Sequence, residues 1–165
     1  MNAAQIKNIL CDIIDYAYPD DEKKEHYKNF SIELLKKENR TLNGYYTYKD
    51  NSIRIMNPSN GNELNFKTCI HELSHHIDWC NRGCSGHGKE FYQHYRELLY
   101  AGLNMRLFTK EDFMTEKDRS NDRNKVHKIL DEWEPTYVDY KKTEIGNTGK
   151  IPLDVLLKLS NWKRK

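Results

Sequence analysis

The chain has 165 residues, with 27 lysines and arginines against 25 aspartates and glutamates and a formal net charge of +2. This near balance does not describe a strongly electropositive nucleic-acid binder, so binding to DNA stays open but is not indicated by charge. No apolar run approaches the roughly 20 residues that span a bilayer, so we expect no membrane contact, a cytoplasmic location and four reduced cysteines.

The length suits one compact domain, and we expect residues 1–165 to form it. The domain is predicted to begin with a helix. Apolar residues recur at helical spacing between Ile6 and Ala17, and Pro19 follows the last of them. This pattern predicts an amphipathic helix over residues 3–18.

A short helix and a β-hairpin are predicted next. The helix is expected around Phe30, Leu34 and Leu35, because these apolar residues precede the Asn-Gly pair that interrupts the chain. The hairpin runs from Tyr45 to Met56 with its turn at residues 49–51. Its alternating side chains are typical of a half-exposed edge.

The segment His71-Glu72-Leu73-Ser74-His75 is the most informative part of the sequence. Its two histidines are four positions apart, so both rings lie on one face of a helix and can reach one tetrahedral zinc ion. Glu72 lies on the adjoining surface, where a carboxylate can take a proton from zinc-bound water. This is the HExxH arrangement of zinc peptidases, and we expect its helix to run from about Glu63 to Cys80.

A catalytic zinc needs a third protein ligand and an open coordination position. His87 is the preferred third ligand, because a Gly- and Cys-containing break at residues 80–86 lets the chain reverse before it. His87 is expected to open a second helix that runs to Ala101 and stops at Gly102. An edge strand beside such a site can pair with an extended peptide, so the hairpin is either a substrate platform or a simple completion of the sheet.

Other uses of the same region compete with this ligand set. A carboxylate could replace His87 as the third ligand, as in thermolysin-like sites. Two cysteines and two histidines could instead form a closed, structural zinc site, although the expected helix end disfavours it. A further histidine could contact substrate, and an aspartate could orient a ligand imidazole. The carboxylate candidates are Glu90 and Glu97, and the closed site would use His76, Cys80, Cys84 and His87. The histidine that could contact substrate is His94, and the aspartate that could orient a ligand is Asp78.

The remainder of the chain is predicted to be a helical extension over about residues 109–165. Its charged stretch is expected to face solvent, because charge runs usually form a solvated face. Three helices are expected, with caps or breaks at Thr109, Pro135 and Pro152. The predicted segments are a short helix from Thr109 to Phe113, a charged stretch from Glu116 to Arg123, a helix through Val126, Ile129, Leu130 and Trp133, a loop over 137–151, and a last helix after Pro152.

The two metal segments resemble a known family. HELSH followed after a short gap by His87-Gly88-x-x-Phe91 looks like the SprT-like metalloproteases, the group that includes Spartan. The hairpin is similar to the one that precedes the metal helix in that family, so the resemblance covers about residues 40–101. It implies that His71, His75 and His87 bind zinc and that Glu72 is the general acid/base. The paired CxxC motifs and the DNA-binding tail known in the family do not occur in this sequence, so a role on DNA–protein crosslinks is not supported.

The sequence therefore predicts an α+β fold, a small helical zincin-like domain with a short hairpin or sheet beside the metal helix. Oligomeric state cannot be read from it. The predicted function is a zinc endopeptidase that hydrolyses a protein or peptide, with DNA-associated proteins as one substrate class. One alternative is a regulatory protease resembling the ImmA/IrrE group, which cuts repressors. Another is a non-catalytic adaptor in which zinc is structural, and the presence of Glu72 speaks against it.

Overall fold

The computed structural model describes residues 1–36, 39, 42–56, 62–114 and 122–135. Met1–Trp133 form one compact unit. Within the described residues it holds six helices and a three-stranded mixed sheet, so the predicted α+β class is confirmed. The expected loop at 137–151 and the helix after Pro152 lie outside the described residues, and the single domain over 1–165 stays a prediction. No described helix is long and apolar enough to cross a membrane.

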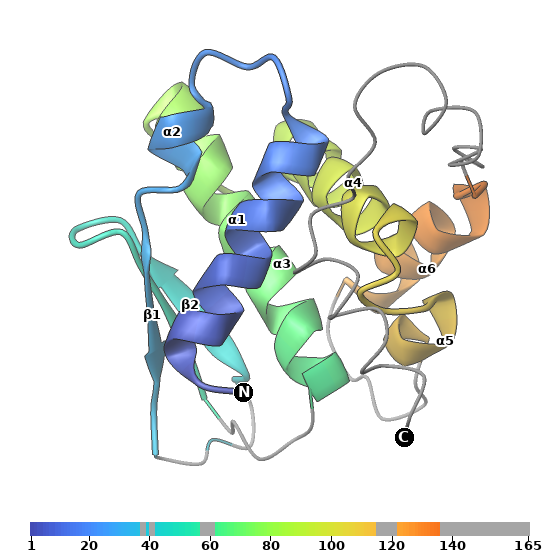
Figure 1. The fold of residues 1–165 in the computed structure, drawn as a ribbon, viewed down its shortest axis with the longest axis horizontal. Helices are drawn as coiled ribbons and strands as arrows, with labels where there is room; N and C mark the ends of the chain where they lie inside the picture. The colour runs from blue at the N-terminus through green and yellow to red at the C-terminus, as the bar shows by residue number, and fades with distance from the viewer. Residues whose placement is uncertain (37–38, 40–41, 57–61, 115–121, 136–165) are drawn as a thin grey trace, which may run out of the picture. The chain divides into compact units, whose positions relative to one another are not determined.

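The elements follow one another along the chain as helices, strands and again helices. They are α1 (Ala3–Ala17), α2 (Lys24–Tyr27), β1 (Ser31–Leu34), β2 (Gly44–Thr47), β3 (Ser52–Ile55), α3 (Asn62–Arg82), α4 (Lys89–Asn104), α5 (Lys110–Phe113) and α6 (Arg123–Glu132). Figure 1 shows the sheet on one side of α1 and α3, with α4 and α6 on the other.

Helix α1 confirms the predicted N-terminal helix to within one residue. Asn2 caps it, because its side chain accepts a hydrogen bond from the Gln5 amide while the Gln5 side chain accepts one from the Asn2 amide. The apolar stripe of the helix is buried, including Leu10 and Ile13 with no exposed surface. Because α1 packs on α4 and on β1, it joins the sheet to the helical layer.

The predicted short helix around Phe30, Leu34 and Leu35 is wrong, because this segment forms strand β1 instead. The strand order is β1-β3-β2, with β1 parallel and β2 antiparallel to β3. Ile32 lies opposite Ile53 and points into the core. A four-residue strand with a partner about twenty positions away has no local periodicity that distinguishes it from a helix turn. Helix α2, which precedes it, has no counterpart among the predicted elements.

The predicted hairpin is confirmed as β2 and β3. Asn51 has a φ of 49° at its turn, a left-handed conformation that Asn tolerates. One face of the hairpin is apolar and buried, with Ile53 and Ile55 inaccessible to solvent. The opposite face carries Arg54, which pairs with Glu33 at 2.9 Å and with Asp50 at 2.8 Å. The sheet therefore has one face towards the core and one face towards solvent.

Helices α3 and α4 form the centre of the molecule and pack against each other (Figure 1). Apolar side chains of both helices point inward. The fully buried ones are Ile70, Leu73 and Ile77 from α3 and Phe91, Tyr95, Leu98 and Leu99 from α4. This shared apolar interface fixes the two chain segments that carry the HExxH motif and the residues after His87.

Gly102 does not end the second helix as predicted, because α4 continues to Asn104. The missing side chain serves close packing instead: a Cβ at this position would lie 2.7 Å from Cε1 of Phe108 and closer still to Cζ. Phe108 is almost completely buried and packs against Phe66 and Phe113. A glycine near a helix end can therefore be required for close packing rather than for ending the helix, and local sequence does not distinguish the two roles.

Gly102→Ala is expected to lower the free energy of unfolding by about 1–2 kcal/mol in urea denaturation. Overpacking a buried site costs about 1–3 kcal/mol, and the better helix propensity of alanine returns up to about 1 kcal/mol. Gly86→Ala is the matched control, because a Cβ there meets nothing within 4 Å. Gly86→Ala should change the free energy of unfolding by no more than about 0.5 kcal/mol. Equal stability of the two variants would contradict the role given to Phe108.

Candidate metal centre

Three histidines converge at the junction of α3 and α4. His71 and His75 stand one turn apart on α3, and His87 lies in the loop that follows. One ring nitrogen from each lies within 4.8 Å of the others, and the described residues contain this one cluster of potential metal ligands. His87 is two residues before α4 begins, rather than its first residue as predicted. The loop, not the helix, therefore delivers the third imidazole.

The ring of Phe91 lies beneath the three histidines. It has no exposed surface, and its centroid is 5.0, 4.4 and 4.9 Å from the ring centroids of His71, His75 and His87. Phe91 of α4 therefore packs against His87 as well as against the two histidines of α3. A rigid aromatic base restricts the three rings to a small set of orientations.

His71 presents one nitrogen to the cluster and the other to a carboxylate. Its Nε2 lies 3.0 Å from Nε2 of His87, and its Nδ1 lies 3.0 Å from Oδ2 of Asp122. The charged stretch up to Arg123 is predicted to face solvent, and this prediction is wrong for Asp122, whose side chain is only 12% exposed. Sequence reasoning misses this residue because nothing local marks a contact between such distant positions in the chain.

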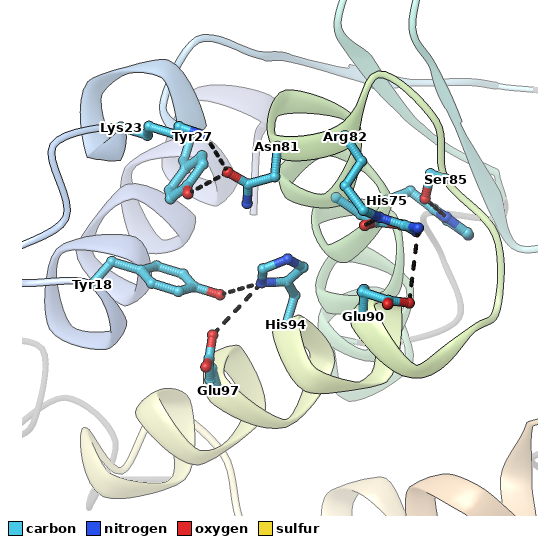
Figure 2. A network of polar contacts seen from close by, with 11 residues as sticks. Tyr18, Lys23, Tyr27, His75, Asn81, Arg82, Ser85, Glu90, His94 and Glu97 are labelled. Atoms are coloured by element: carbon cyan, nitrogen blue, oxygen red, sulfur yellow. Dashed lines mark hydrogen bonds and ion pairs between the residues drawn. The ribbon is translucent and has the colours of Figure 1, made fainter.

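His75 is oriented by a polar chain that runs through the loop. Its Nδ1 lies 2.8 Å from Oγ of Ser85, and the Ser85 hydroxyl hydrogen bonds to the buried Asp78. Figure 2 shows the His75 and Ser85 side chains in contact. Arg82 donates two hydrogen bonds of 2.6 and 2.7 Å to Asp78, and Arg82 also lies 3.8 Å from Glu90. Asp78 therefore reaches the His75 imidazole through a serine rather than directly.

The charge of Asp78 is maintained despite its burial. Burial alone would raise its pKa, but the hydrogen bonds from Arg82 and Ser85 outweigh that effect and hold the pKa below its usual range. The ionised carboxylate then accepts the Ser85 O–H, and the Ser85 oxygen is left to accept the Nδ1–H of His75. This order of donors directs Nε2 of His75 towards the cluster.

The three imidazoles fit a divalent metal. Burial, followed by the neighbouring His71 and His87, lowers the pKa of His75 to about 3. The pKa of His87 is lowered in the same way, so both rings are held in the neutral form that binds metal. Two nitrogens on one tetrahedral zinc lie about 3.3 Å apart when each bond is about 2.0–2.1 Å. The 3.0 Å between His71 and His87 is close to that spacing.

Glu72 connects the metal helix to the sheet. Its side chain is 7% exposed, and burial raises its pKa, although the neighbouring His71 and a backbone hydrogen bond from Tyr46 oppose the increase. Tyr46 belongs to β2, which is an edge of the sheet. The Tyr46 N–H bonds to Glu72 of α3, so it is not paired with a neighbouring strand. The outer edge of β2 therefore passes beside this carboxylate. The hairpin therefore lies beside the metal helix as predicted, while its use as a substrate platform stays a prediction.

The alternative third ligands lie elsewhere. Glu90 faces Arg82, and Glu97 accepts a hydrogen bond from Gln93 and lies 3.6 Å from His94. His94 itself lies 3.1 Å from the hydroxyl of Tyr18, so it belongs to a network between α1 and α4 rather than to the histidine cluster (Figure 2). The structure thus groups His87 with His71 and His75, and neither glutamate with them.

The competing site of His76, Cys80, Cys84 and His87 is not assembled. His76 is fully buried and lies 3.1 Å from the Tyr46 hydroxyl, as expected for a packing residue. Cys84 is exposed in the loop, whereas Cys80 lies 3.7 Å from Nε2 of His76. The helix continues to Arg82, but the break after it turns Cys84 away from the line of the other two residues.

A comparison with protein-family models gives a match to the SprT-like family over residues 15–110. The matched span is more than half of the chain and contains all three histidines together with Glu72. The chain belongs to the SprT-like family. This confirms the resemblance drawn from the two metal segments and makes residues 15–110 a metalloprotease-like domain. Searches of curated proteins and of solved structures gave no match. Asp122 and α6 lie beyond the matched residues.

Proposed function

We propose that this SprT-like chain is a zinc endopeptidase. His71, His75 and His87 hold the zinc ion, and Glu72 is the general acid/base. The observation that carries the proposal is the convergence of three imidazoles, two from α3 and one from the loop after it, together with a buried carboxylate on α3. Three imidazoles with an open fourth position are the ligand set of a catalytic rather than a structural zinc site.

The protein groups have separate tasks in peptide hydrolysis. Zinc, when bound, supplies Lewis-acid polarisation of a peptide carbonyl and activation of a water molecule. Glu72 accepts the proton of that water and returns it to the amine that leaves. Burial raises the pKa of Glu72, and a base of higher pKa accepts a proton more readily. A closed structural site has no use for such a carboxylate, and this argues against the adaptor alternative.

The outer edge of β2 is the proposed binding surface for substrate. Unpaired N–H and C=O groups of an edge strand hydrogen bond the backbone of any extended peptide, whatever its sequence. The hydrogen bond between the Tyr46 amide and Glu72 brings this edge close to the carboxylate. We therefore propose an extended or unfolded polypeptide as substrate. The match to the SprT-like family favours this reading over a repressor-specific protease of the ImmA/IrrE group.

Zinc content and cleavage, measured together, test the proposed function. The wild-type chain should contain one zinc per chain by elemental analysis and should cleave an unfolded protein. His87→Ala should lose most of its zinc and at least about 100-fold in cleavage rate, because a site with two imidazoles lacks a third anchor. The matched control is His94→Ala, which removes a histidine of the Tyr18 network and should keep its zinc.

Two outcomes would contradict the proposal. Full zinc retention by His87→Ala would overturn the ligand set. A zinc-loaded wild type that cleaves no unfolded protein, with or without single-stranded DNA, would favour a substrate-restricted regulatory protease or an adaptor. Cleavage that appears only with DNA would keep the endopeptidase and add DNA as an activator.

A further inference from the structure

Asp122 immediately precedes α6, a position where an aspartate usually caps its own helix. Its side chain makes no capping hydrogen bond to α6. Oδ2 instead lies 3.0 Å from Nδ1 of His71, and the Asp122 side chain is 12% exposed. Capping of α6 therefore does not explain the position of the Asp122 carboxylate.

Helix α6 is attached to α4 by contacts that do not involve His71. Val126 and Leu130 of this helix are fully buried. The Tyr100 hydroxyl donates a 2.8 Å hydrogen bond to the carbonyl of Ile129, and Lys125 lies 4.4 Å from the centroid of the Tyr92 ring. Two further contacts join the C-terminal part of α6 to α4. These are Arg96 with Glu132 at 2.8 Å and Trp133 with Asn104 at 3.2 Å.

We propose that Asp122 is a positioning residue for His71 at the metal centre. The ion-pair contact places its carboxylate at Nδ1, which favours the tautomer with the proton on Nδ1 and an unprotonated Nε2, and it orients that nitrogen towards His75 and His87. The negative charge also makes the imidazole a stronger electron donor to a bound metal. The inference rests on the proposed role of His71 as a ligand, and it does not depend on peptidase activity.

The two helix-borne histidines are thus oriented in different ways. His75 faces a neutral hydroxyl, and the charge behind it, on Asp78, is neutralised by Arg82. His71 faces a carboxylate directly. Because α6 lies outside the residues matched by the SprT-like family model, a segment beyond the matched domain completes the ligand geometry. Removing this one carboxylate should therefore weaken metal binding without removing a ligand.

The test is the zinc affinity of full-length variants, measured by competition with a chromophoric chelator. Asp122→Ala should bind zinc about 10–100-fold more weakly than wild type, as expected when the partner of a ligand histidine is lost. Asp122→Asn should fall between the two, because its amide oxygen can still accept the Nδ1–H but carries no charge. Asp131→Asn is the matched control, since it removes an exposed aspartate of the same helix and should leave the affinity unchanged.

A purely structural role for Asp122 predicts a different pattern. In that case the Asp122 variants would have a lower free energy of unfolding in urea without metal. The zinc affinity of the folded chain would stay at the wild-type value. Wild-type affinity in both Asp122 variants would overturn the inference. A wild-type chain that binds no zinc would instead refute the proposed function, so the two failures can be told apart.

Discussion

Glu72→Gln is expected to keep one zinc per chain and to lose about 10²–10⁴-fold in kcat/KM for an unfolded protein substrate. Glutamine has nearly the shape of glutamate, and its side-chain oxygen can still accept the hydrogen bond from the Tyr46 amide. It cannot accept a proton from water at neutral pH. Because Glu72 does not belong to the histidine cluster, the ligand set is unchanged. Loss of activity with unchanged zinc therefore separates proton transfer from metal binding.

Glu90→Gln is the matched control for this experiment. Glu90 is an exposed glutamate in the first turn of α4, where it lies 3.8 Å from Arg82. Its substitution should leave zinc content unchanged and kcat/KM within about twofold, because an exposed ion pair contributes little. A drop in zinc content would reopen Glu90 as the third ligand. Full activity in Glu72→Gln would contradict the acid/base role, and activity lost together with zinc would show that this carboxylate supports the ligand geometry.

The features predicted from sequence are those with a local signal. The spacing of His71 and His75 is a property of one helix, and the apolar stripes of α1, α3 and α4 repeat within a few turns. The position of His87 follows from a break that reverses the chain. Local pattern therefore favours His87 as the third ligand but leaves Glu90 and Glu97 open, and it is the packed structure that groups the three histidines. The α+β class follows from the same kind of signal, because a turn with a strand on each side is visible in the sequence.

The features missed depend on partners far away in the chain. Strand β1 forms because Ile32 finds Ile53 in register, and its four residues alone do not distinguish a strand from a helix turn. Gly102 has the local pattern of a helix stop, but its role is set by Phe108. Asp122 is one charge in a charged stretch until α6 is docked on α4, and only then does it face His71. In each case tertiary packing supplies the information that the sequence pattern lacks.

Removing zinc is expected to lower the free energy of unfolding by several kcal/mol. A ligand that binds only the folded chain stabilises it by about 4 kcal/mol when its free concentration is about 1,000 times Kd. The effect is local in origin, because the loop over residues 83–88 is exposed along its whole length. Within the described residues its contacts to α3 include the Ser85 hydroxyl with His75 and the Gly83 amide with the Trp79 carbonyl at 2.8 Å. Zinc bound by His87 would add the strongest of these links.

Urea unfolding with zinc and with a chelator measures this difference, and hydrogen exchange locates it. Chelation should increase exchange at residues 84–88, while the buried turns of α4 around Tyr95 and Leu98 stay protected until global unfolding. His87→Ala is the matched control, because its stability should not respond to zinc. Equal stability of the wild type with and without zinc would show that the loop is held by protein contacts alone, and it would contradict the proposed zinc link between this loop and α3.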